Sequence, residues 1–556
     1  MKIMRDIADR YKRIAAGIAI IAFLAIIYFA MIPGALVASA GVYTTSGVGI
    51  KDALVKLVDY PQYNATTAPD GTYTMPNVPI GTYNISASAI GYATNKSQIT
   101  VTASPPDTIK DFTLSLNAKM VGIIWISSYT GGTITSTMAS QLPRPSDIGT
   151  EFSGQYDSRK DIAGYYTAIL VSDVYGTGAN LAINYLYDNG TPYSTANGVV
   201  PVNGTFTLAP GDSGLLMGRV VIKSNNPVAA EKRIVSFIPG TWTSRGIMST
   251  LMPERGSAAT QFFGQYDSRK DTAGWYTAIL VTDVLGTGAT LTINYYNDAG
   301  TSYGSPVTAV VPVNGTYVLT PGDSGQLLGK VKITSTSPVV AEKRIVYFTP
   351  GTWNAYDLMS DSMTKQSDAS KELIVPIYDG RKDTLGWYSV VLISDISGTG
   401  ANVKLDYLYL NGTLYMTTNQ PVPVNGTLTI VPGDSGLLYG KMLIHSDNLV
   451  VGEERIVNFA PGTWNTRGIM AFNLLKDTDA VKDLVVPQYD SSGEWDAEVV
   501  VSAVNGASSP LLNYFNGAGA LDHKEYYDIP VNGSYAFYPG DVTMGRLEVG
   551  KVTVNG

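Results

Sequence analysis

Residues 265–271 read Gln-Tyr-Asp-Ser-Arg-Lys-Asp, and the same seven residues stand at 155–161. A third copy, Tyr-Asp-Gly-Arg-Lys-Asp, occupies residues 378–383, and a shortened fourth copy begins with Tyr-Asp-Ser-Ser at 489–492. The tyrosines of the four copies, at positions 156, 266, 378 and 489, are separated by 110, 112 and 111 residues. A fixed period of this size indicates a tandem array of similar domains.

The composition favours a β-rich extracellular protein. Of the 556 residues, 45 % are apolar and only 15 % are charged, with 57 glycines and 36 tyrosines. A chain of this length is too long for one hydrophobic core and predicts several domains. The net charge is −8 and no basic cluster follows the first fourteen residues, which argues against nucleic acid as a partner. The chain has no cysteine, which excludes disulfides, thiolate metal sites and a cysteine nucleophile.

The first forty residues have the pattern of an export signal. Five basic residues precede an uncharged run from Ile14 to Ile32, and the small residues Ala38 and Ala40 end the segment. This pattern predicts a secretory signal peptide that is cleaved between Ala40 and Gly41. The alternative is an uncleaved membrane anchor, because the nineteen uncharged residues are long enough to span ~30 Å of hydrocarbon. Both interpretations place the rest of the chain outside the cell, since the basic residues stay on the cytoplasmic side.

Residues 41–117 carry motifs of their own, and turn residues separate their short alternating strands. In order, the motifs are Asp70-Gly71-Thr72-Tyr73, Pro79-Ile80-Gly81-Thr82-Tyr83-Asn84-Ile85 and Gly91-Tyr92. This series resembles the carboxypeptidase regulatory-like domain, and the resemblance implies a small prealbumin-like β-sandwich. In that family the domain is an accessory spacer or adhesive unit and not the catalytic domain. Related pilin-type sandwiches carry a Lys–Asn isopeptide bond, but the opening strand near residues 42–44 has no lysine, so no such bond is expected.

Each unit of the array repeats the same turn signals. In the second unit they are Asn314-Gly315, which favours a type I′ hairpin turn, and Pro321-Gly322, which favours a type II turn. Segments such as residues 289–295 alternate between apolar and polar side chains, as amphipathic strands do. Short strands separated by such turns predict a sandwich of about seven strands in ~110 residues. The expected fold class is therefore all-β, a tandem array of Ig-like or prealbumin-like sandwiches after an N-terminal hydrophobic segment.

The domain boundaries depend on where the repeat is taken to begin. Counting from the Ala-Glu-Lys-Arg-Ile-Val segment gives domains 41–117, 118–229, 230–340, 341–451 and 452–556 after the N-terminal segment 1–40. We prefer this choice because it leaves no unpaired strand; it also makes Trp125 a counterpart of the tryptophan in the recurring Pro-Gly-Thr-Trp motif. Counting from the Tyr-Asp-Ser-Arg-Lys-Asp segment instead leaves the last sandwich incomplete and open to a strand from another subunit, as in donor-strand filaments.

The segment Gly-Asp-Ser-Gly recurs at 211–214, 322–325 and 433–436 and resembles the nucleophile motif of trypsin-like serine proteases. A serine nucleophile of that kind needs an imidazole base. The chain has two histidines, His445 and His523, so three such serines cannot each have one. We interpret the motif as a turn and predict that the protein is not an enzyme.

A metal site is not predicted either. Asp157 with Asp161, and Asp267 with Asp271, could donate oxygens to calcium, but the arginine and lysine between them oppose a cation. No residue pattern points to a cofactor.

The Tyr-Asp-Ser-Arg-Lys-Asp loops are the candidate ligand contacts. A tyrosine can stack on a sugar ring, and an arginine can donate two hydrogen bonds to a carboxylate. The candidate residues are Tyr156, Arg159, Tyr266, Arg269, Tyr378 and Arg381. The competing interpretation, which we favour, is a surface turn held by local ion pairs.

Nine sequons are candidate sites of N-glycosylation. They stand at Asn64, Asn84, Asn95, Asn189, Asn203, Asn314, Asn411, Asn425 and Asn532. Four of them, at 203, 314, 425 and 532, repeat one hairpin turn, and the turn preference of Asn-Gly explains their presence. Sequons, an export signal and the lack of cysteine together resemble an archaeal surface-layer-like or adhesin-type protein.

These observations predict a structural or adhesive extracellular protein that forms a rod, a filament or a surface layer, with contacts between neighbouring units setting its stability. The expected partners are copies of the chain, neighbouring surface proteins or glycans, and only the N-terminal segment would contact a membrane. The alternative is a carbohydrate-binding or targeting protein that serves a separate enzyme. Exposed aromatic platforms on one face of every unit would favour the alternative, and their absence would favour the structural role.

Overall fold

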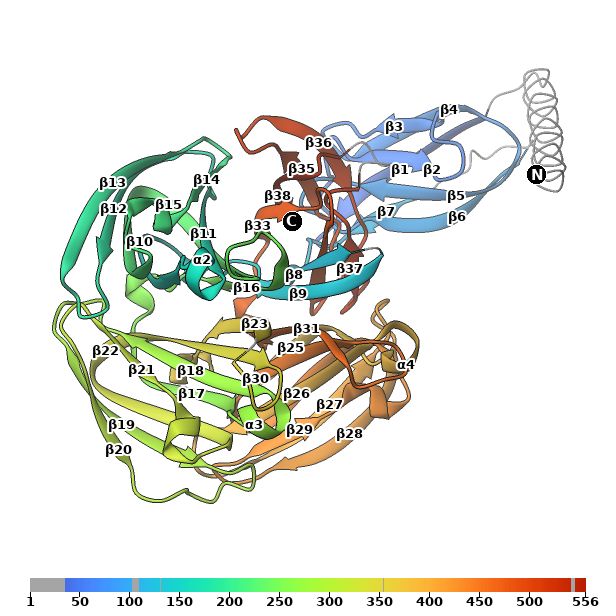
Figure 1. Cartoon of the computed structure of the whole chain (residues 1–556). Helices are drawn as coiled ribbons and strands as arrows, with labels where there is room; N and C mark the ends of the chain where they lie inside the picture. The colour runs from blue at the N-terminus through green and yellow to red at the C-terminus, as the bar shows by residue number, and fades with distance from the viewer. Residues whose placement is uncertain (1–35, 103–109, 131, 354, 542–545) are drawn as a thin grey trace, which may run out of the picture. The chain divides into compact units, whose positions relative to one another are not determined.

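The structure is a computed structural model of the whole chain, and it describes residues 36–102, 110–130, 132–353, 355–541 and 546–556 (Figure 1). The chain divides into two compact units, Met1–Asn117 and Ala118–Gly556, so that a boundary lies at the expected position between residues 117 and 118. The expected all-β fold is confirmed. Among the described residues, no helix is long and apolar enough to cross a membrane. Residues 1–35 of the predicted signal or anchor lie outside the described residues.

The first unit is a sandwich of two sheets around one core. Its strands are β1 (Leu36–Thr44), β2 (Leu54–Leu57), β3 (Asn64–Thr66), β4 (Thr72–Val78), β5 (Gly81–Ser88), β6 (Asn95–Val101) and β7 (Phe112–Leu114). One sheet has the order β4-β1-β7 and the other β3-β2-β5-β6. Val42 and Phe112 of the first sheet share a buried core with Val55 and Ile85 of the second.

The predicted cleavage site lies inside strand β1. Ala40 pairs with Tyr73 and Gly41 with Thr72 of β4, and β1 is the middle strand of its sheet. Cleavage between Ala40 and Gly41 would remove half of this strand from the folded domain. The structure therefore argues against cleavage at this bond.

The second unit contains four modules of the same design. Module 1 comprises η1 (Pro145–Asp147), β10 (Ile148–Asp157), α2 (Lys160–Ala163), β11 (Tyr165–Asp173), β12 (Ala179–Leu186), β13 (Pro192–Val200), β14 (Thr205–Leu208), η2 (Pro210–Ser213), β15 (Met217–Phe237) and β16 (Ser244–Leu251). Module 2 comprises η3 (Arg255–Ser257), β17 (Ala259–Asp267), α3 (Lys270–Ala273), β18 (Trp275–Thr282), β19 (Ala289–Tyr296), β20 (Val307–Val311), β21 (Thr316–Leu319), η4 (Pro321–Ser324), β22 (Leu328–Phe348), β23 (Ala355–Ser362) and β24 (Thr364–Lys365). Module 3 comprises η5 (Gln366–Asp368), β25 (Ser370–Asp379), α4 (Lys382–Leu385), β26 (Trp387–Asp395), β27 (Ala401–Leu408), β28 (Leu414–Val422), β29 (Thr427–Ile430), η6 (Pro432–Ser435), β30 (Tyr439–Phe459), β31 (Thr466–Asn473) and β32 (Leu475–Lys476).

A 21-residue strand runs through both sheets of modules 1 to 3. In module 1 this strand is β15, whose first half pairs with β10 and β12 and whose second half pairs with β11 and β16. The strand changes sheets near Pro227, which has no amide hydrogen to donate to a ladder. Alternate side chains along it fill the core between the two sheets.

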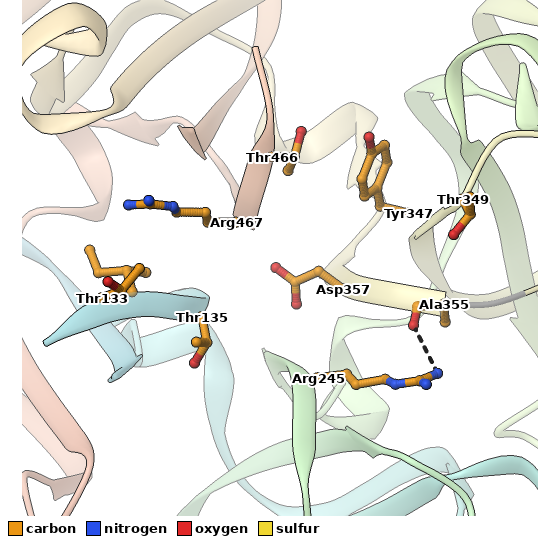
Figure 2. Close-up of a pocket in the computed structure, with 10 residues that line it drawn as sticks. Thr133, Thr135, Arg245, Tyr347, Thr349, Ala355, Asp357, Thr466 and Arg467 are labelled. Atoms are coloured by element: carbon orange, nitrogen blue, oxygen red, sulfur yellow. Dashed lines mark hydrogen bonds between the residues drawn. The ribbon is translucent and has the colours of Figure 1, made fainter. Parts of the chain in front are cut away.

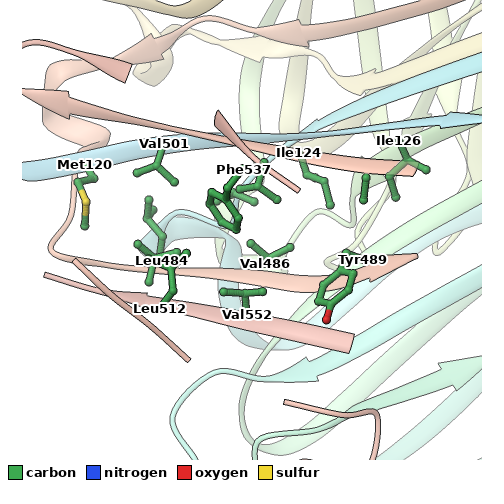
Figure 3. Packing of buried hydrophobic residues seen from close by; sticks show 14 of the residues in the cluster. Met120, Ile124, Ile126, Leu484, Val486, Tyr489, Val501, Leu512, Phe537 and Val552 are labelled. Atoms are coloured by element: carbon green, nitrogen blue, oxygen red, sulfur yellow. The ribbon is translucent and has the colours of Figure 1, made fainter. Parts of the chain in front are cut away.

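Module 4 is assembled from the two ends of the second unit. It comprises η7 (Asp477–Asp479), β33 (Asp483–Asp490), β34 (Trp495–Val504), β35 (Leu511–Phe515), β36 (Leu521–Tyr526), β37 (Ser534–Phe537) and β38 (Val549–Asn555), together with β8 (Lys119–Thr130) and β9 (Thr133–Gln141). Its sheets have the orders β33-β38-β35-β36 and β37-β34-β8-β9. Met120, Ile124 and Ile126 of β8 complete the hydrophobic core of this module, as Figure 3 shows.

The domain boundaries expected within this unit do not match these modules. The divisions at 229/230, 340/341 and 451/452 fall inside β15, β22 and β30, and Val228 and Ala230 belong to one core. Counting from the Tyr-Asp-Ser-Arg-Lys-Asp segment correctly predicted that the C-terminal residues alone form an incomplete last sandwich. However, β8 of the same chain supplies the missing strand, and no second subunit is needed.

Both recurring turns differ from the expected types. In the Asn-Gly turns the asparagine is left-handed, with φ of 56° at Asn203, and the amide of Gly204 donates to the carbonyl of Pro201 at 2.9 Å. A left-handed third residue followed by a glycine that is not left-handed is typical of a type II turn and not of type I′. The Pro-Gly segments form 3₁₀ helices such as η2, which ends at the left-handed Gly214.

The modules contact one another in a closed order, 1–2–3–4–1. In each pair, an amide at the start of a short strand donates to a carbonyl in a hairpin of the preceding module. The bonds are Thr316 N to Asp188 O at 2.8 Å, Thr427 N to Asp298 O at 2.9 Å, Ser534 N to Leu410 O at 2.8 Å and Thr205 N to Gly517 O at 3.4 Å. The modules therefore do not follow one another in a line, and the rod of serial sandwiches expected from the sequence is wrong for this unit.

Four strands, one from each module, meet where the modules come together (Figure 1). These inner strands are β9, β16, β23 and β31; β16 and β31 each contact β9 and β23, and β9 and β23 also contact each other. We call the line along which they meet the module axis.

Candidate ligand-binding sites

The recurring sequence motifs come together at one end of each of the modules 1 to 3. In module 1, the helical turn α2 ends at the left-handed Gly164, whose carbonyl accepts a hydrogen bond from the amide of Phe237 at 2.6 Å. The same bond joins Phe348 to Gly274 and Phe459 to Gly386, at 2.7 Å in each case. These bonds hold the hairpin with the Pro-Gly-Thr-Trp motif against the Tyr-Asp-Ser-Arg-Lys-Asp loop.

Each of these hairpins exposes a tryptophan. The side chains of Trp242, Trp353 and Trp464 are 68 %, 65 % and 64 % exposed. A lysine Nζ lies 4.5 Å from each ring centroid, and a tyrosine and a phenylalanine contact each ring edge-on. We call these groups the aromatic clusters; they are Lys160, Tyr166, Phe237 and Trp242, then Lys270, Tyr276, Phe348 and Trp353, and then Lys382, Tyr388, Phe459 and Trp464.

Carboxylates border each aromatic cluster. Lys160 Nζ forms an ion pair with Asp161 at 2.6 Å, and the corresponding pairs recur in modules 2 and 3. The hydroxyl of Tyr276 lies 3.5 Å from both carboxylate oxygens of Asp323, which belongs to a Gly-Asp-Ser-Gly segment. Burial and then the charge of Asp323 raise the pKa of Tyr276, so this tyrosine stays a neutral hydroxyl. Each cluster thus combines an exposed aromatic face with charged and hydroxyl hydrogen-bonding groups.

Module 4 has no counterpart of these clusters among its described residues. Trp125 was expected to match the exposed tryptophans, but it is 5 % exposed and packs against Trp387 with ring centroids 5.9 Å apart. Trp125 of β8 pairs with Glu498 of β34 at the position where Arg344 of β22 pairs with Ala278 of β18. Trp125 therefore corresponds to Arg344 and not to Trp353.

The candidate tyrosines of the sequence motif are core residues. Tyr156, Tyr266 and Tyr378 are at most 1 % exposed, and each contacts a second buried tyrosine edge-on. This position corrects the expectation that they contact a ligand, because a surface ligand cannot reach their rings.

The candidate arginines hold the loop together. Arg159, Arg269 and Arg381 each donate to both carboxylate oxygens of the aspartate two residues earlier, with Nη2–Oδ2 distances of 2.6, 2.5 and 2.5 Å. This is the turn with local ion pairs that we favoured from the sequence. The pair fixes the loop that carries the lysine of the aromatic cluster.

The Gly-Asp-Ser-Gly serines take part in turns. The hydroxyls of Ser213 and Ser435 accept hydrogen bonds from the amides two residues later, at 3.2 Å. His445 lies between Glu372 and Asp406, and His523 lies beside Glu525. In the described residues neither histidine contacts these serines, and no three His, Cys, Asp or Glu side chains are grouped so that they could hold a metal ion.

The asparagines of the sequons lie on or near the surface. Asn64, Asn84, Asn95, Asn189, Asn314 and Asn411 are exposed, and Asn203, Asn425 and Asn532 are half-buried. Their glycosylation stays a prediction.

A second candidate site was not foreseen from the sequence: a pocket of about 500 Å³ where the inner strands begin (Figure 2). We call it the axial pocket. Residues from all four modules line it, and they are Thr133, Ile134, Thr135, Arg245, Tyr347, Thr349, Ala355, Asp357, Thr466 and Arg467. Arg245 and Arg467 occupy equivalent positions in modules 1 and 3, in the segments Ser-Arg-Gly-Ile-Met and Thr-Arg-Gly-Ile-Met. The dipeptide Arg-Gly, which occurs in both segments, was the one feature of the sequence that could have pointed to this site. The sequence does not indicate that the two copies line one pocket.

Asp357 lies in the wall of the axial pocket and ties three modules together. Its carboxylate accepts hydrogen bonds from the amide of Ile469 at 2.6 Å and from the hydroxyl of Ser136 at 3.2 Å. The side chain is 1 % exposed, and burial raises the pKa of Asp357 well above its ordinary value. The equivalent positions in modules 1 and 3 are Gly246 and Gly468; a side chain at Gly246 would collide with the Asp357 carboxyl group, and one at Gly468 would collide with Thr137.

Comparisons with known proteins identify the first unit. Residues 39–115 match the family model of the carboxypeptidase regulatory-like domain. The first unit carries this domain. The match confirms the resemblance seen in the sequence, and it does not extend into the four modules. No curated protein matches the chain.

Solved structures with a partial likeness include pilus proteins. The major pilin subunit BcpA of Bacillus cereus is 11 % identical over 60 % of this chain and 96 % of that chain, with a TM-score of 0.12. The RrgB pilus protein of Streptococcus pneumoniae is 9 % identical over 79 % of this chain and 93 % of that chain, with a TM-score of 0.13. A cohesin–X-dockerin complex of Acetivibrio cellulolyticus is 14 % identical over 15 % of this chain and 59 % of that chain, less than two thirds of its length, with a TM-score of 0.13. Likenesses this partial say nothing about function.

Proposed function

We propose that this protein is a non-enzymatic adhesive protein of the cell surface, and that its four-module unit binds glycans through the aromatic clusters. One observation carries the proposal: three modules each expose a tryptophan in the same surroundings, at Trp242, Trp353 and Trp464. Exposed aromatic groups of this kind, present in three of the four modules, favour a carbohydrate-binding role over a purely structural one.

The exposure of the three indole rings needs a reason. A tryptophan is one of the largest apolar side chains, and leaving it in water forgoes its burial energy. The edge-on contacts of Tyr166 and Phe237 hold Trp242 in a fixed position on the surface. A fixed aromatic face suits the apolar C–H face of a pyranose ring, and the adjacent lysine and aspartate can bond the sugar hydroxyl groups.

Three such sites on one folded unit support adhesion. A single exposed ring binds a sugar weakly, but binding at a second and third cluster becomes intramolecular when the sugars lie on one polymer or surface. The closed order of contacts between the modules holds the three clusters at constant separations. The avidity would therefore be highest for a glycan that is dense or repetitive.

The cell-surface location belongs to the same proposal. The uncharged run of residues 14–32 with its basic flank supports export or anchoring, and the carboxypeptidase regulatory-like domain would separate the four modules from that segment. Copies of the chain and neighbouring surface proteins are further candidate partners of such a protein. A filament made by strand exchange finds no support, because β8 already fills the place of the missing strand in module 4.

The test is a glycan array probed with the full chain in a detergent without a sugar headgroup. We expect binding to a defined group of glycans, a loss of about threefold to tenfold in each of Trp242→Ala, Trp353→Ala and Trp464→Ala, and no measurable binding in the triple variant. Tyr175→Ala and Tyr526→Ala are matched controls, because these rings are 63 % and 58 % exposed but lie outside the clusters. Unchanged binding in a folded triple variant would contradict the proposal, as would a wild-type chain that binds no glycan.

A further inference from the structure

We propose that a pocket on the outer face of module 1 binds a uronic acid residue of a glycan, and that Arg219 holds the carboxylate of this sugar. The inference rests on the proposed glycan binding and names the class of sugar that the unit would select. The pocket has a volume of about 420 Å³ and lies where module 1 meets module 2. We call it the outer pocket; its lining includes Glu151, Asn184, Tyr193, Arg219 and Lys223 of module 1 and Asn314 of module 2.

The outer pocket is a hollow over one sheet of module 1, in which β13, β12, β15 and β10 lie side by side (Figure 1). Alternate residues of a strand point to the same side of its sheet. Arg219, Val221 and Lys223 of β15 therefore share the outer face. The residues between them, Val220 and Ile222, belong to the core. Two loops of module 2 complete the lining.

Arg219 has an unused hydrogen-bond donor. The residue is 3 % exposed, and its Nε and Nη1 donate to the Ser153 hydroxyl and the Asn314 carbonyl, each at 2.6 Å. Nη2 has no hydrogen-bond partner in the part of the chain that the structure describes. A buried donor without an acceptor is costly, so an acceptor on a ligand would stabilise this group.

The positive charge of Arg219 is only partly compensated. Burial lowers the pKa of Arg219 to about 10, and the attraction of Asp283 and Glu151 does not offset this effect. Neither carboxylate forms an ion pair with Arg219, and Glu151 already pairs with Lys223 and Arg255, at 3.7 and 3.1 Å. Because a guanidinium group stays protonated at neutral pH, it keeps a buried charge that an anion from solution could balance.

Modules 2 to 4 carry a lysine at the position of Arg219. Burial lowers the pKa values of these residues, Lys330, Lys441 and Lys551, to about 8, 7 and 8. A buried lysine can release its proton close to neutral pH and so avoid the cost of a buried charge, whereas an arginine cannot. Module 1 therefore keeps a permanent charge where the other modules do not need to.

The space beside this cation is open in module 1, whereas an aromatic ring occupies it in modules 2 and 4. Lys330 Nζ lies 5.5 Å from the ring centroid of Tyr296, and Lys551 Nζ lies 5.7 Å from that of Phe515. The equivalent residue of module 1 is Leu186, whose smaller side chain lines the outer pocket. Without a ring at this place, the pocket extends to the guanidinium group.

The remaining lining suits a sugar. Asn184 and Thr195 are paired residues of β12 and β13, and they offer an amide and a hydroxyl group to sugar hydroxyls. Tyr193, which is 41 % exposed, adds an aromatic ring that can lie against the C–H face of a pyranose. The volume of about 420 Å³ lies within the range of small-ligand pockets. A cation, hydroxyl-bonding groups and an aromatic ring together match a uronic acid better than a simple anion.

The experiment is titration calorimetry of the full chain with single sugars, in a detergent without a sugar headgroup. The probes are glucuronic acid and galacturonic acid, the neutral sugars glucose and galactose, glucose 6-sulfate, and acetate. We expect a uronic acid to bind in the millimolar range, and its neutral counterpart and acetate to bind at least tenfold more weakly. No binding of either uronic acid, stronger binding of glucose 6-sulfate, or equal binding of the neutral sugars or of acetate would overturn the assignment.

Variants that copy another module into module 1 test the site with residues that the fold already accepts. Arg219→Lys should weaken uronic acid binding about threefold or more, and Arg219→Lys with Leu186→Tyr, the pair found in module 2, at least tenfold. Both should keep the unfolding temperature within a few degrees. Tyr193→Ala changes an exposed residue and should weaken binding about threefold, whereas Lys371→Gln, outside the pocket, is the matched control. A folded double variant that binds like the wild type would overturn the inference.

The same measurements separate the outer pocket from the aromatic clusters. If the triple tryptophan variant loses array binding but still binds the uronic acid, both proposals are supported. If that variant loses array binding and no form of the chain binds a uronic acid, only the assignment of the outer pocket is wrong. Uronic acid binding that depends on Arg219, with array binding that does not depend on the tryptophans, would support the pocket and contradict adhesion through the clusters.

Discussion

Buried ion pairs join neighbouring modules at the scale of single residues. Lys232 of module 1 is 1 % exposed, and its Nζ lies 2.5 Å from Glu342 of module 2 and 3.0 Å from the carbonyl of Gln155. Burial lowers the pKa of Lys232 to about 8, whereas Arg344 and Lys232 outweigh the effect of burial on Glu342 and hold its pKa at about 2. Lys343 and Glu453 repeat the pair between modules 2 and 3. Such pairs add little net stability, because the cost of removing both charges from water offsets their attraction.

Glu454 interrupts this pattern in module 3. It stands where Lys232 and Lys343 stand in modules 1 and 2, and it is fully buried without a cationic partner among the described residues. Burial raises the pKa of Glu454 well above its ordinary value. The folded protein therefore keeps a proton on Glu454 that the unfolded chain releases above a pH of about 4.3.

We predict that Glu454→Gln stabilises the protein at neutral and alkaline pH. A carboxyl group with a raised pKa stabilises the folded state at low pH, and this contribution is lost as the pH rises from about 4.3 towards the folded-state pKa. The amide cannot ionise, so the variant should gain about 1–3 kcal/mol over the wild type at pH 8 and little at pH 4. Thermal unfolding at pH 4, 6 and 8 measures the difference, with Glu494→Gln at an exposed position as the control. A constant difference between variant and wild type across this range would contradict the prediction.

At the scale of elements, the hairpin of β8 and β9 decides whether module 4 is complete. β34 pairs with β8 along ten residues, from Trp495 with Ser128 to Val504 with Lys119. Met120, Ile124 and Ile126 of β8, together with Met138 of β9, belong to the same core as the apolar residues of β34 and β38. Without them the apolar side chains of β34 and β38 would face water.

We predict that residues 118–142 are indispensable for folding of the second unit and that residues 1–117 are not. The chain 118–556 should give a single cooperative unfolding transition, whereas the chain 143–556 should aggregate or lose the transition of module 4. Calorimetry and size-exclusion chromatography distinguish these outcomes. A synthetic peptide of residues 118–142 should restore the transition when added during refolding, and a scrambled peptide should not. An unchanged transition in the chain 143–556 would show that β8 is dispensable.

At the scale of the whole second unit, residues from its beginning and its end, in β8 and β38, share the place that a single long strand takes in each of the other modules. β38 and β8 together take the place of β22 in module 2, and Gly556 lies against Met120 and donates its amide to the carbonyl of Lys482. Module 4 aligns with module 2 when Lys551 is matched to Lys330 and Ile126 to Ile345. In this alignment only one residue of module 2, Thr336, has no counterpart between Gly556 and Ala118. Loop closure over so short a gap costs little.

We therefore predict that the second unit tolerates circular permutation. A chain in which Gly556 is joined to Ala118 by about one to three residues, with new ends between Pro253 and Glu254, should keep the unfolding temperature of the chain 118–556 within a few degrees. Its array binding should also be unchanged. A permutant with new ends between Ala341 and Glu342, inside β22, is the control and should be strongly destabilised because it divides a buried strand. Equal stability of the two permutants would contradict the role assigned to strand continuity.

Several features of the protein could be predicted from local sequence because local sequence determines them. The spacing of Tyr156, Tyr266, Tyr378 and Tyr489 gave the repeat, and the aspartate and arginine two residues apart pair with each other in all three copies of the loop. The all-β class followed from alternating segments between turn residues, and the motifs of residues 70–92 were enough to recognise the first domain.

The arrangement of the modules and both candidate sites depended on contacts between residues far apart in the chain. Nothing local distinguishes a strand that ends a linear array from one that completes a cycle, so the pairing of β8 with β34 appears only when the chain is folded. The direction of each side chain was also undetermined: the motif tyrosines turn into the core, while Trp353 is 65 % exposed. The axial pocket likewise exists only in the folded unit, because its lining residues come from all four modules and Arg245 and Arg467 alone are 222 positions apart.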